Sequence, residues 1–220
     1  MGCPANNSQF GYTMKAPTTT LPYGVSVDFT VPSGVTSVAS TSTGKWCTAG
    51  NLIANDGSGN YAECSITYFA SGGSQSQGWY FWYGWNGSGS YISLGTAPTG
   101  DSVTLTLQWN GSQWQATLTD HTHSGNNQAA GIGSSSKFSI ANSNIWFENG
   151  GNTTCSNYSS WGSTLTFSNL KYYDINGSQI SFSNAICGYV NCNVPNTCTG
   201  GTACITESTS VSSLTITRNC

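Results

Sequence analysis

The chain alternates apolar and polar residues over short stretches that Gly, Ser, Asn and Pro separate. The stretches with this pattern are GVSVDFTVP, CSITYFA, GWYFWYGW, SVTLTLQW, SQWQATLTD, NIWFE, STLTFSNLKYY, SQISFS and SSLTITR. A period of two places successive side chains on opposite faces of a β-strand. Asn110-Gly111 and Asn176-Gly177 each separate two such stretches, and Asn-Gly is a preferred pair for a hairpin turn. The pattern predicts an all-β protein: an antiparallel β-sandwich of two bent sheets, of jelly-roll or concanavalin-like type.

The 220 residues suit one β-sandwich domain over 1–220. Residues 1–22 contain the uncharged run APTTTLP and are expected to form an extended N-terminal arm. Residues 187–207 concentrate cysteines and are expected to form a loop or cap that disulfides hold.

One predicted strand, residues 78–85, is aromatic on both faces. Alternation places Trp79, Phe81, Tyr83 and Trp85 on one face and Tyr80 and Trp82 on the other. In a bent sheet one set fills the core and the other lines an outer groove; alternatively, loops cover the outer side and both sets are core. The predicted groove residues are Trp79, Tyr80, Trp82, Tyr83 and Trp85. Rigid aromatic walls favour a polysaccharide, a peptide or a neighbouring subunit.

Charged residues make up only 6% of the chain, and the net charge is −3. The polar surface must therefore consist of Ser, Thr, Asn, Gln and Gly. Because the cations are few and scattered, a nucleic-acid partner is not expected. Eight carboxylates with few cations leave few ion pairs for acid to break, so we expect the fold to tolerate low pH. No apolar run approaches the length of a membrane span, and no cofactor is expected.

Nine cysteines without a Cys-x-x-Cys pair favour disulfides in an oxidising compartment over a zinc site. The pairing is open, and the odd number leaves one thiol over, which either bridges to another chain or is buried. The cysteines are Cys3, Cys47, Cys64, Cys155, Cys187, Cys192, Cys198, Cys204 and Cys220. Acceptor motifs for N-glycosylation also favour a secreted protein of the extracellular surface. They occur at Asn6, Asn86, Asn110, Asn152, Asn157 and Asn176.

Several stretches follow one another in an informative order. They are VSVDFTVPSG, GWYFWYGWNG, PTGDSVTLTLQWNGSQWQATLTDHTHSG, NIWFENG, WGSTLTFSNLKYYDINGS and VSSLTITR. Over roughly residues 23–218 this series resembles the glutamic peptidase (eqolisin) family of acid-acting secreted endopeptidases. The resemblance implies a sandwich of two bent sheets. It also implies a catalytic Glu that acts as general acid and base, and a Gln that polarises the scissile carbonyl.

The catalytic pair of the family is not reproduced in this sequence. Ile145 stands where the resemblance places the Glu, and an aliphatic side chain transfers no proton. Glu148 lies three residues further on, so only a β-bulge would bring it to the same face. Glu63 stands close to the position of the Gln. Glu148 with Glu63 or a nearby Gln therefore remains the candidate for a displaced peptidase dyad.

Other chemistry is weaker. His121 and His123 alternate beside Asp120, which fits a metal site or, more simply, a polar hairpin turn; no metal is expected. Glu63 and Glu148 would also form a glycosidase pair if their separation were suitable.

Our first interpretation is a secreted, non-catalytic structural or adhesive protein. It would be a subunit of an extracellular layer or filament that self-associates or binds other extracellular proteins, the arm adding to a neighbour's sheet edge. The first alternative is an acid-acting glutamic endopeptidase. The second is a carbohydrate-binding module that stacks sugars on Trp79, Trp82 and Trp85.

Overall fold

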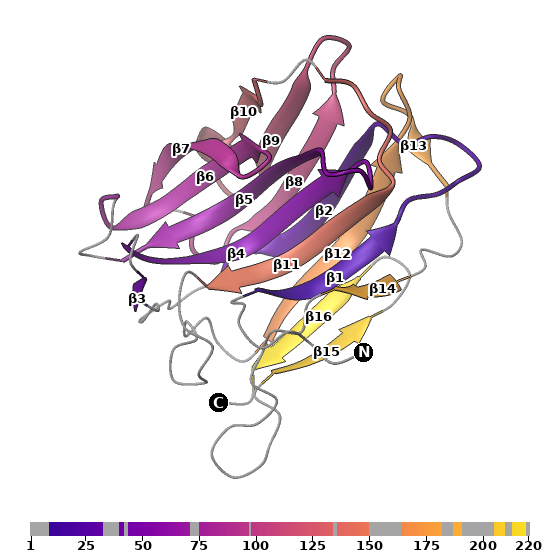
Figure 1. Cartoon of the computed structure of the whole chain (residues 1–220). Helices are drawn as coiled ribbons and strands as arrows, with labels where there is room; N and C mark the ends of the chain where they lie inside the picture. Colours follow the sequence, from indigo (N-terminus) through magenta and orange to yellow (C-terminus); the bar gives the residue numbers. More distant parts are fainter. Residues whose placement is uncertain are drawn as a thin grey trace.

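The computed structural model describes residues 9–32, 40–41, 44–70, 75–96, 98–133, 136–149, 164–181, 187–190, 205–209 and 213–218. These residues form two antiparallel sheets that pack face to face (Figure 1). The predicted all-β sandwich of two sheets is confirmed. The described residues contain no helix with the length and apolarity that a membrane crossing requires.

The first sheet has its strands in the order β14, β1, β11, β4, β5, β6 and β7, with β3 beside β4. Their bounds are β14 (Cys187–Val190), β1 (Gln9–Lys15), β11 (Asn142–Asn149), β4 (Gly44–Asn55), β5 (Tyr61–Phe69), β6 (Gly78–Trp85), β7 (Ser88–Gly95) and β3 (Ser40–Thr41). Figure 1 shows this sheet in front of the other.

The second sheet has its strands in the order β10, β9, β8, β2, β12, β16 and β15, with β13 beside β12. Their bounds are β10 (Gln128–Gly131), β9 (Trp114–Asp120), β8 (Ser102–Trp109), β2 (Gly24–Thr30), β12 (Thr164–Tyr173), β16 (Leu214–Arg218), β15 (Ile205–Thr209) and β13 (Gln179–Ile180). A 3₁₀ turn, η1 (Ser124–Asn126), follows β9.

The core lies between the sheets and takes every second residue of each central strand. From β8 it takes Val103, Leu105 and Leu107, which are fully buried. From β5 it takes Cys64 and Ile66. In β8 and β9 the two-residue period read from the sequence is therefore the period of burial. It also fixes which side chains point away from the core.

Three expectations need correction. Residues 9–15 of the expected arm form β1, which pairs with β11 on one side and β14 on the other. Residues 187–190 of the expected cap form β14, and 205–207 begin β15. Cys64 is a buried free thiol and joins no disulfide. The side chains of the other eight cysteines lie outside the described residues, and so does the rest of the expected cap.

Candidate functional site

The outer face of the first sheet carries polar side chains that are buried. On β5, Ala62, Cys64 and Ile66 enter the core, so the alternate residues Glu63, Ser65 and Thr67 point away from it. These three are nevertheless only 6%, 2% and 4% exposed. Polar groups facing out from a sandwich are normally solvated. Other parts of the molecule therefore cover this part of the outer face, which is called the floor below.

A β-bulge in β4 adds two more polar residues to the floor. Thr48 pairs with Thr67 and Gly50 pairs with Ile66, so Ala49 is an extra residue in β4. Gly50 faces inward, because a Cβ there would lie 2.7 Å from the Phe29 ring. Thr48 and Asn51 therefore both face outward, on either side of the bulge.

Hydrogen bonds join the hydroxyl groups of the floor. Thr48 Oγ1 lies 3.3 Å from Thr67 Oγ1, which lies 3.0 Å from Ser65 Oγ. Asn51 differs from them. It is 5% exposed, and its Oδ1 has no hydrogen-bond partner among the described residues. A buried acceptor without a donor is costly, so this atom is suited to accept a hydrogen bond from a ligand.

Glu63 is fixed in place by the β6–β7 hairpin. The backbone N–H of Gly87 donates to Glu63 Oε1 at 3.1 Å. Asn86 and Gly87 have φ values of 48° and 80°, which a tight two-residue hairpin turn requires. The Asn-Gly sequence therefore bends this hairpin so that its amide reaches the carboxylate.

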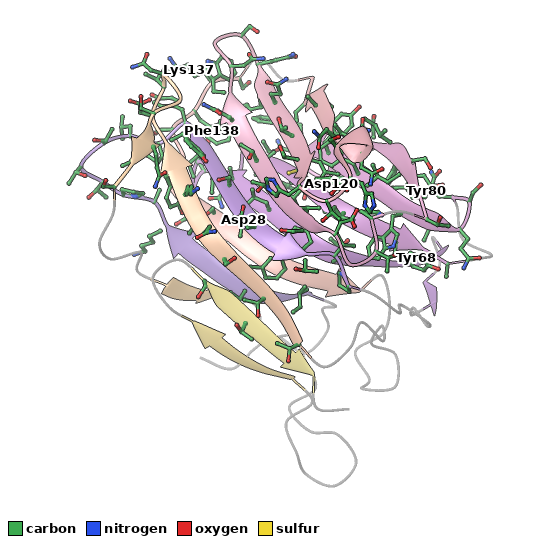
Figure 2. All side chains as sticks on the ribbon, turned by 180° about the vertical axis from the view of Figure 1, so that it is seen from behind. Asp28, Tyr68, Tyr80, Asp120, Lys137 and Phe138 are labelled. Carbon is green, nitrogen blue, oxygen red and sulfur yellow. The ribbon has the colours of Figure 1, made fainter. Side chains whose placement is uncertain are left out.

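The aromatic strand β6 divides as alternation predicts, but the core takes more of the predicted groove residues than the groove does. Tyr80 and Trp82 face outward, opposite Thr67 and Ser65 of β5. Three of the predicted groove residues instead belong to the core side: Trp79, Tyr83 and Trp85. Figure 2 labels Tyr80 and Tyr68 on this sheet.

Two further aromatic residues complete the outer cluster. Tyr91 of β7 is 42% exposed, and its ring centroid lies 5.2 Å from that of Phe69 and 6.2 Å from that of Tyr80. The sequence pattern does not single out Tyr91, because β7 is otherwise rich in Ser and Gly. Asn51 was missed because its orientation depends on the bulge.

The register of β11 decides which of its positions lie level with the floor residues. Ile145, the position compared with the catalytic Glu, pairs with Leu52 of β4, and Leu52 belongs to the core. Asn144 pairs with Ile53, which in turn pairs with Glu63. Trp146 pairs with Asn51, and Glu148 pairs with Thr48 beyond the bulge. The backbone register thus places position 144 level with Glu63 and position 148 level with Thr67.

The two glutamates of the predicted dyad lie at different levels along the strands, where a level is one set of cross-strand partners. Glu63 and Glu148 belong to strands that β4 separates, and they are four residues apart along the sheet. Standard strand spacings put their Cα atoms about 16 Å apart. Glu63 and Asn144 share one level, which puts their Cα atoms about 10 Å apart. Gln9 pairs directly with Glu148.

The two histidines form hydrogen bonds with different residues at the second sheet. His121 Nε2 lies 2.8 Å from Thr104 Oγ1, which donates to Asp28 on β2. His123 Nδ1 donates to Asp101 Oδ2 at 2.7 Å, and the hydrogen bond and charge of Asp101 raise the pKa of His123. Figure 2 labels Asp28 and Asp120.

Asp120 organises the turn after β9. Its Oδ1 accepts the backbone N–H groups of Thr122 and His123, and its Oδ2 accepts from Asn126. Burial raises the pKa of Asp120, but the hydrogen bonds outweigh burial and leave the pKa below its usual value. Ligand atoms of Asp101, Asp120 and His123 lie within 4.8 Å of one another. The hydrogen bonds that these residues make within the turn explain why they lie close together, without a metal ion.

Three predicted glycosylation sites lie in exposed turns. Asn86, Asn110 and Asn176 each begin an Asn-Gly-Ser turn. Asn110 Oδ1 accepts the N–H groups of Ser112 and Gln113, so its side chain stabilises its own turn. Asn6, Asn152 and Asn157 lie outside the described residues.

Comparison with known structures identifies the fold as that of the glutamic peptidases. Scytalido-glutamic peptidase, solved with a peptide-based transition state analog, is similar with a TM-score of 0.60 and 14% identity, over 96% of this chain and 98% of that one. SCP-B, a member of the eqolisin family of peptidases solved with the tripeptide Ala-Ile-His, gives 0.55 and 14%, over 96% and 98%. Aspergilloglutamic peptidase from Aspergillus niger gives 0.50 and 18%, over 79% and 98%. No protein-family model and no curated protein matches the sequence.

Proposed function

We propose that the outer face of the first sheet binds an extended polypeptide and hydrolyses it in acid. One observation supports the proposal: Glu63, whose side chain is buried, and Asn144 both pair with Ile53 of β4, one from each side. The resemblance to glutamic peptidases implies a carboxyl and an amide as the working pair. Here the two groups stand on the opposite strands from those that the resemblance implies.

The chemistry needs only these two groups and water. The Glu63 carboxylate takes a proton from a water molecule, whose oxygen then attacks the scissile carbonyl carbon. The amide of Asn144 donates a hydrogen bond to the oxyanion that forms. As the C–N bond breaks, the Glu63 carboxylic acid returns its proton to the leaving amine. No other reactant is required.

Asn51 supports a polypeptide as the ligand. Its Oδ1 lacks a donor among the described residues, and it lies on the adjacent strand, two cross-strand pairs along from Glu63. A substrate main chain offers N–H groups at regular intervals. One such group on Asn51 would satisfy the acceptor and hold the chain across the floor.

The test is digestion of acid-denatured casein at pH 3.5 with two matched variants. Glu63→Gln is expected to lower kcat/KM by about 10²-fold or more, because the proton carrier is lost. Glu148→Gln removes the same charge from the same sheet and is expected to keep most of the activity. Circular dichroism checks that both variants fold.

A double variant tests directly whether the carboxyl group and the amide can exchange strands. Glu63→Gln combined with Asn144→Glu moves the carboxyl to β11 and the amide to β5, and activity above that of Glu63→Gln alone is expected. Loss of activity in Glu148→Gln with retention in Glu63→Gln would reinstate the displaced dyad. Activity that survives both single changes, or is missing from the wild type, would end the proposal.

The structural or adhesive role stays a prediction without added support. It relied on an N-terminal arm free to join another sheet, whereas residues 9–15 already pair with β11, and 11–14 also pair with β14, within their own sheet.

A further inference from the structure

The indole of Trp82 lies across the backbone of two facing glycines. Gly84 and Gly89 are directly opposed in β6 and β7. A Cβ on Gly84 would lie 2.9 Å from Trp82 Cζ2, and a Cβ on Gly89 would lie 2.9 Å from Trp82 Cε2 and Cζ2. The ring therefore occupies the space above both glycines and covers the hairpin. Side chains at either position would displace it.

This placement brings the indole beside Glu63. Gly84 is the cross-strand partner of Glu63, so the place next to the carboxylate that a side chain of residue 84 would fill is taken by Trp82. Glu63 itself is held by the amide of Gly87, at the tip of the same hairpin. The aromatic ring and the carboxylate are thus positioned by one structural element.

The indole is only partly buried, and Tyr91 continues its surface. The two ring centroids lie 6.4 Å apart with 48° between the planes. Tyr91 rests on Phe69 and Tyr80 and is 42% exposed. The rings together form an angled aromatic surface at the hairpin end of the floor. Aromatic side chains that serve only the core, such as Trp79 and Phe81, are almost completely buried.

We propose that Trp82, flanked by Tyr91, is a subsite for a ring-bearing side chain on the substrate residue beside the cleaved bond: proline, phenylalanine or tyrosine. The inference rests on the proposed function, because it takes the ligand to be a polypeptide that passes Glu63. Rings stack on an indole face with little loss of side-chain entropy, and grooves between aromatic rings are a recurrent binding mode for proline. A small or charged side chain gains nothing comparable there.

Calorimetry with three synthetic heptapeptides tests this subsite at pH 7. The peptides are identical except for Pro, Phe or Ala at the central position. The wild type is expected to bind the ring-bearing peptides about tenfold more tightly than the Ala peptide, as stacking on an aromatic surface allows. Trp82→Ala is expected to abolish the difference and leave binding of the Ala peptide within about twofold. Trp82→Phe, which keeps a flat ring, is expected to retain part of it.

The outcomes separate the subsite from the function. Equal binding of all three peptides by the wild type, or a preference that survives Trp82→Ala, overturns the subsite and leaves the polypeptide function standing. Binding of xylo- or cello-oligosaccharides that depends on Trp82, with no binding of any peptide, overturns both and assigns the surface to carbohydrate. A matching enrichment of ring residues beside cleaved bonds in a digested peptide mixture at pH 3.5, lost in Trp82→Ala, supports the subsite independently.

Discussion

At the scale of single residues, the unusual property of this molecule is polarity that is buried on an outward face. Glu63, Ser65 and Thr67 are buried almost as deeply as the core residues Cys64 and Ile66 between them. The hydroxyl groups satisfy one another, whereas Asn51 Oδ1 has no partner among the described residues. Such a group lowers stability unless it serves binding.

The first prediction concerns Asn51. Replacement by Leu removes the unpaired acceptor while keeping the volume, so the free energy of unfolding is expected to stay constant or rise by about 1 kcal/mol. Peptide affinity and casein digestion are expected to fall. Thr67→Val is the control: it breaks the Thr48–Thr67–Ser65 contacts and is expected to cost about 1 kcal/mol. Urea unfolding measures both, and a loss of 2 kcal/mol or more in Asn51→Leu would assign the side chain a structural role.

At the scale of secondary structure, the bulge in β4 determines which side chains form the floor. Period-two reading assigned the two faces of β6 correctly, because that strand pairs with β5 without interruption. The same reading would put Thr48 and Asn51 of β4, three residues apart, on opposite faces, whereas both face outward. A single extra residue in a strand leaves no mark in the hydrophobic pattern.

The second prediction concerns this bulge. A methyl group on Gly50 would lie 2.7 Å from Phe29 and 3.1 Å from Phe167. Both rings are buried and pack on each other, so Gly50→Ala is expected to lower the free energy of unfolding by about 1–3 kcal/mol. Gly125→Ala meets nothing within 4 Å and is expected to be nearly neutral. Equal unfolding midpoints for the two variants in urea would show that the sheets separate easily at the bulge.

At the scale of the whole molecule, the low charge of the sequence is matched by few charged contacts. Among the described residues the ion pair is His123 with Asp101. Asp56 accepts hydrogen bonds from Ser58 and Asn60; burial raises its pKa, but these bonds outweigh burial and lower the pKa to about 2. Carboxylates of this molecule are held mainly by neutral donors.

The third prediction is a stability plateau in acid. The lowered pKa values of Asp56 and Asp120 mean that their stabilisation is complete above the unfolded value near 4 and is lost as pH falls through the folded values. The raised pKa of His123 acts the other way: its contribution is complete below about pH 6.5 and is lost as pH rises through the folded value. The melting temperature is therefore expected to be highest between about pH 4 and 6 and to decline gradually below. A steep loss between pH 7 and pH 4 would contradict this expectation.

The sequence predicted the architecture more completely than the site. Alternation and Asn-Gly turns identify the strands and the sandwich, because burial of one face controls both. Pairing between distant segments is not encoded locally. β1 therefore read as a free arm, although it lies between β11 and β14, and the shared level of Glu63 and Asn144 could not be seen before the register was known.

The reactivity of Cys64 reports transient opening of the space between the two sheets. The thiol lies between the sheets with no exposed surface, and burial, helped by the charge of Glu63, raises its pKa well above the ordinary value. A reagent such as iodoacetamide can reach it only when the layers part. The alkylation rate of Cys64 would therefore measure how often the sheets separate. A ligand bound above Glu63 should lower this rate.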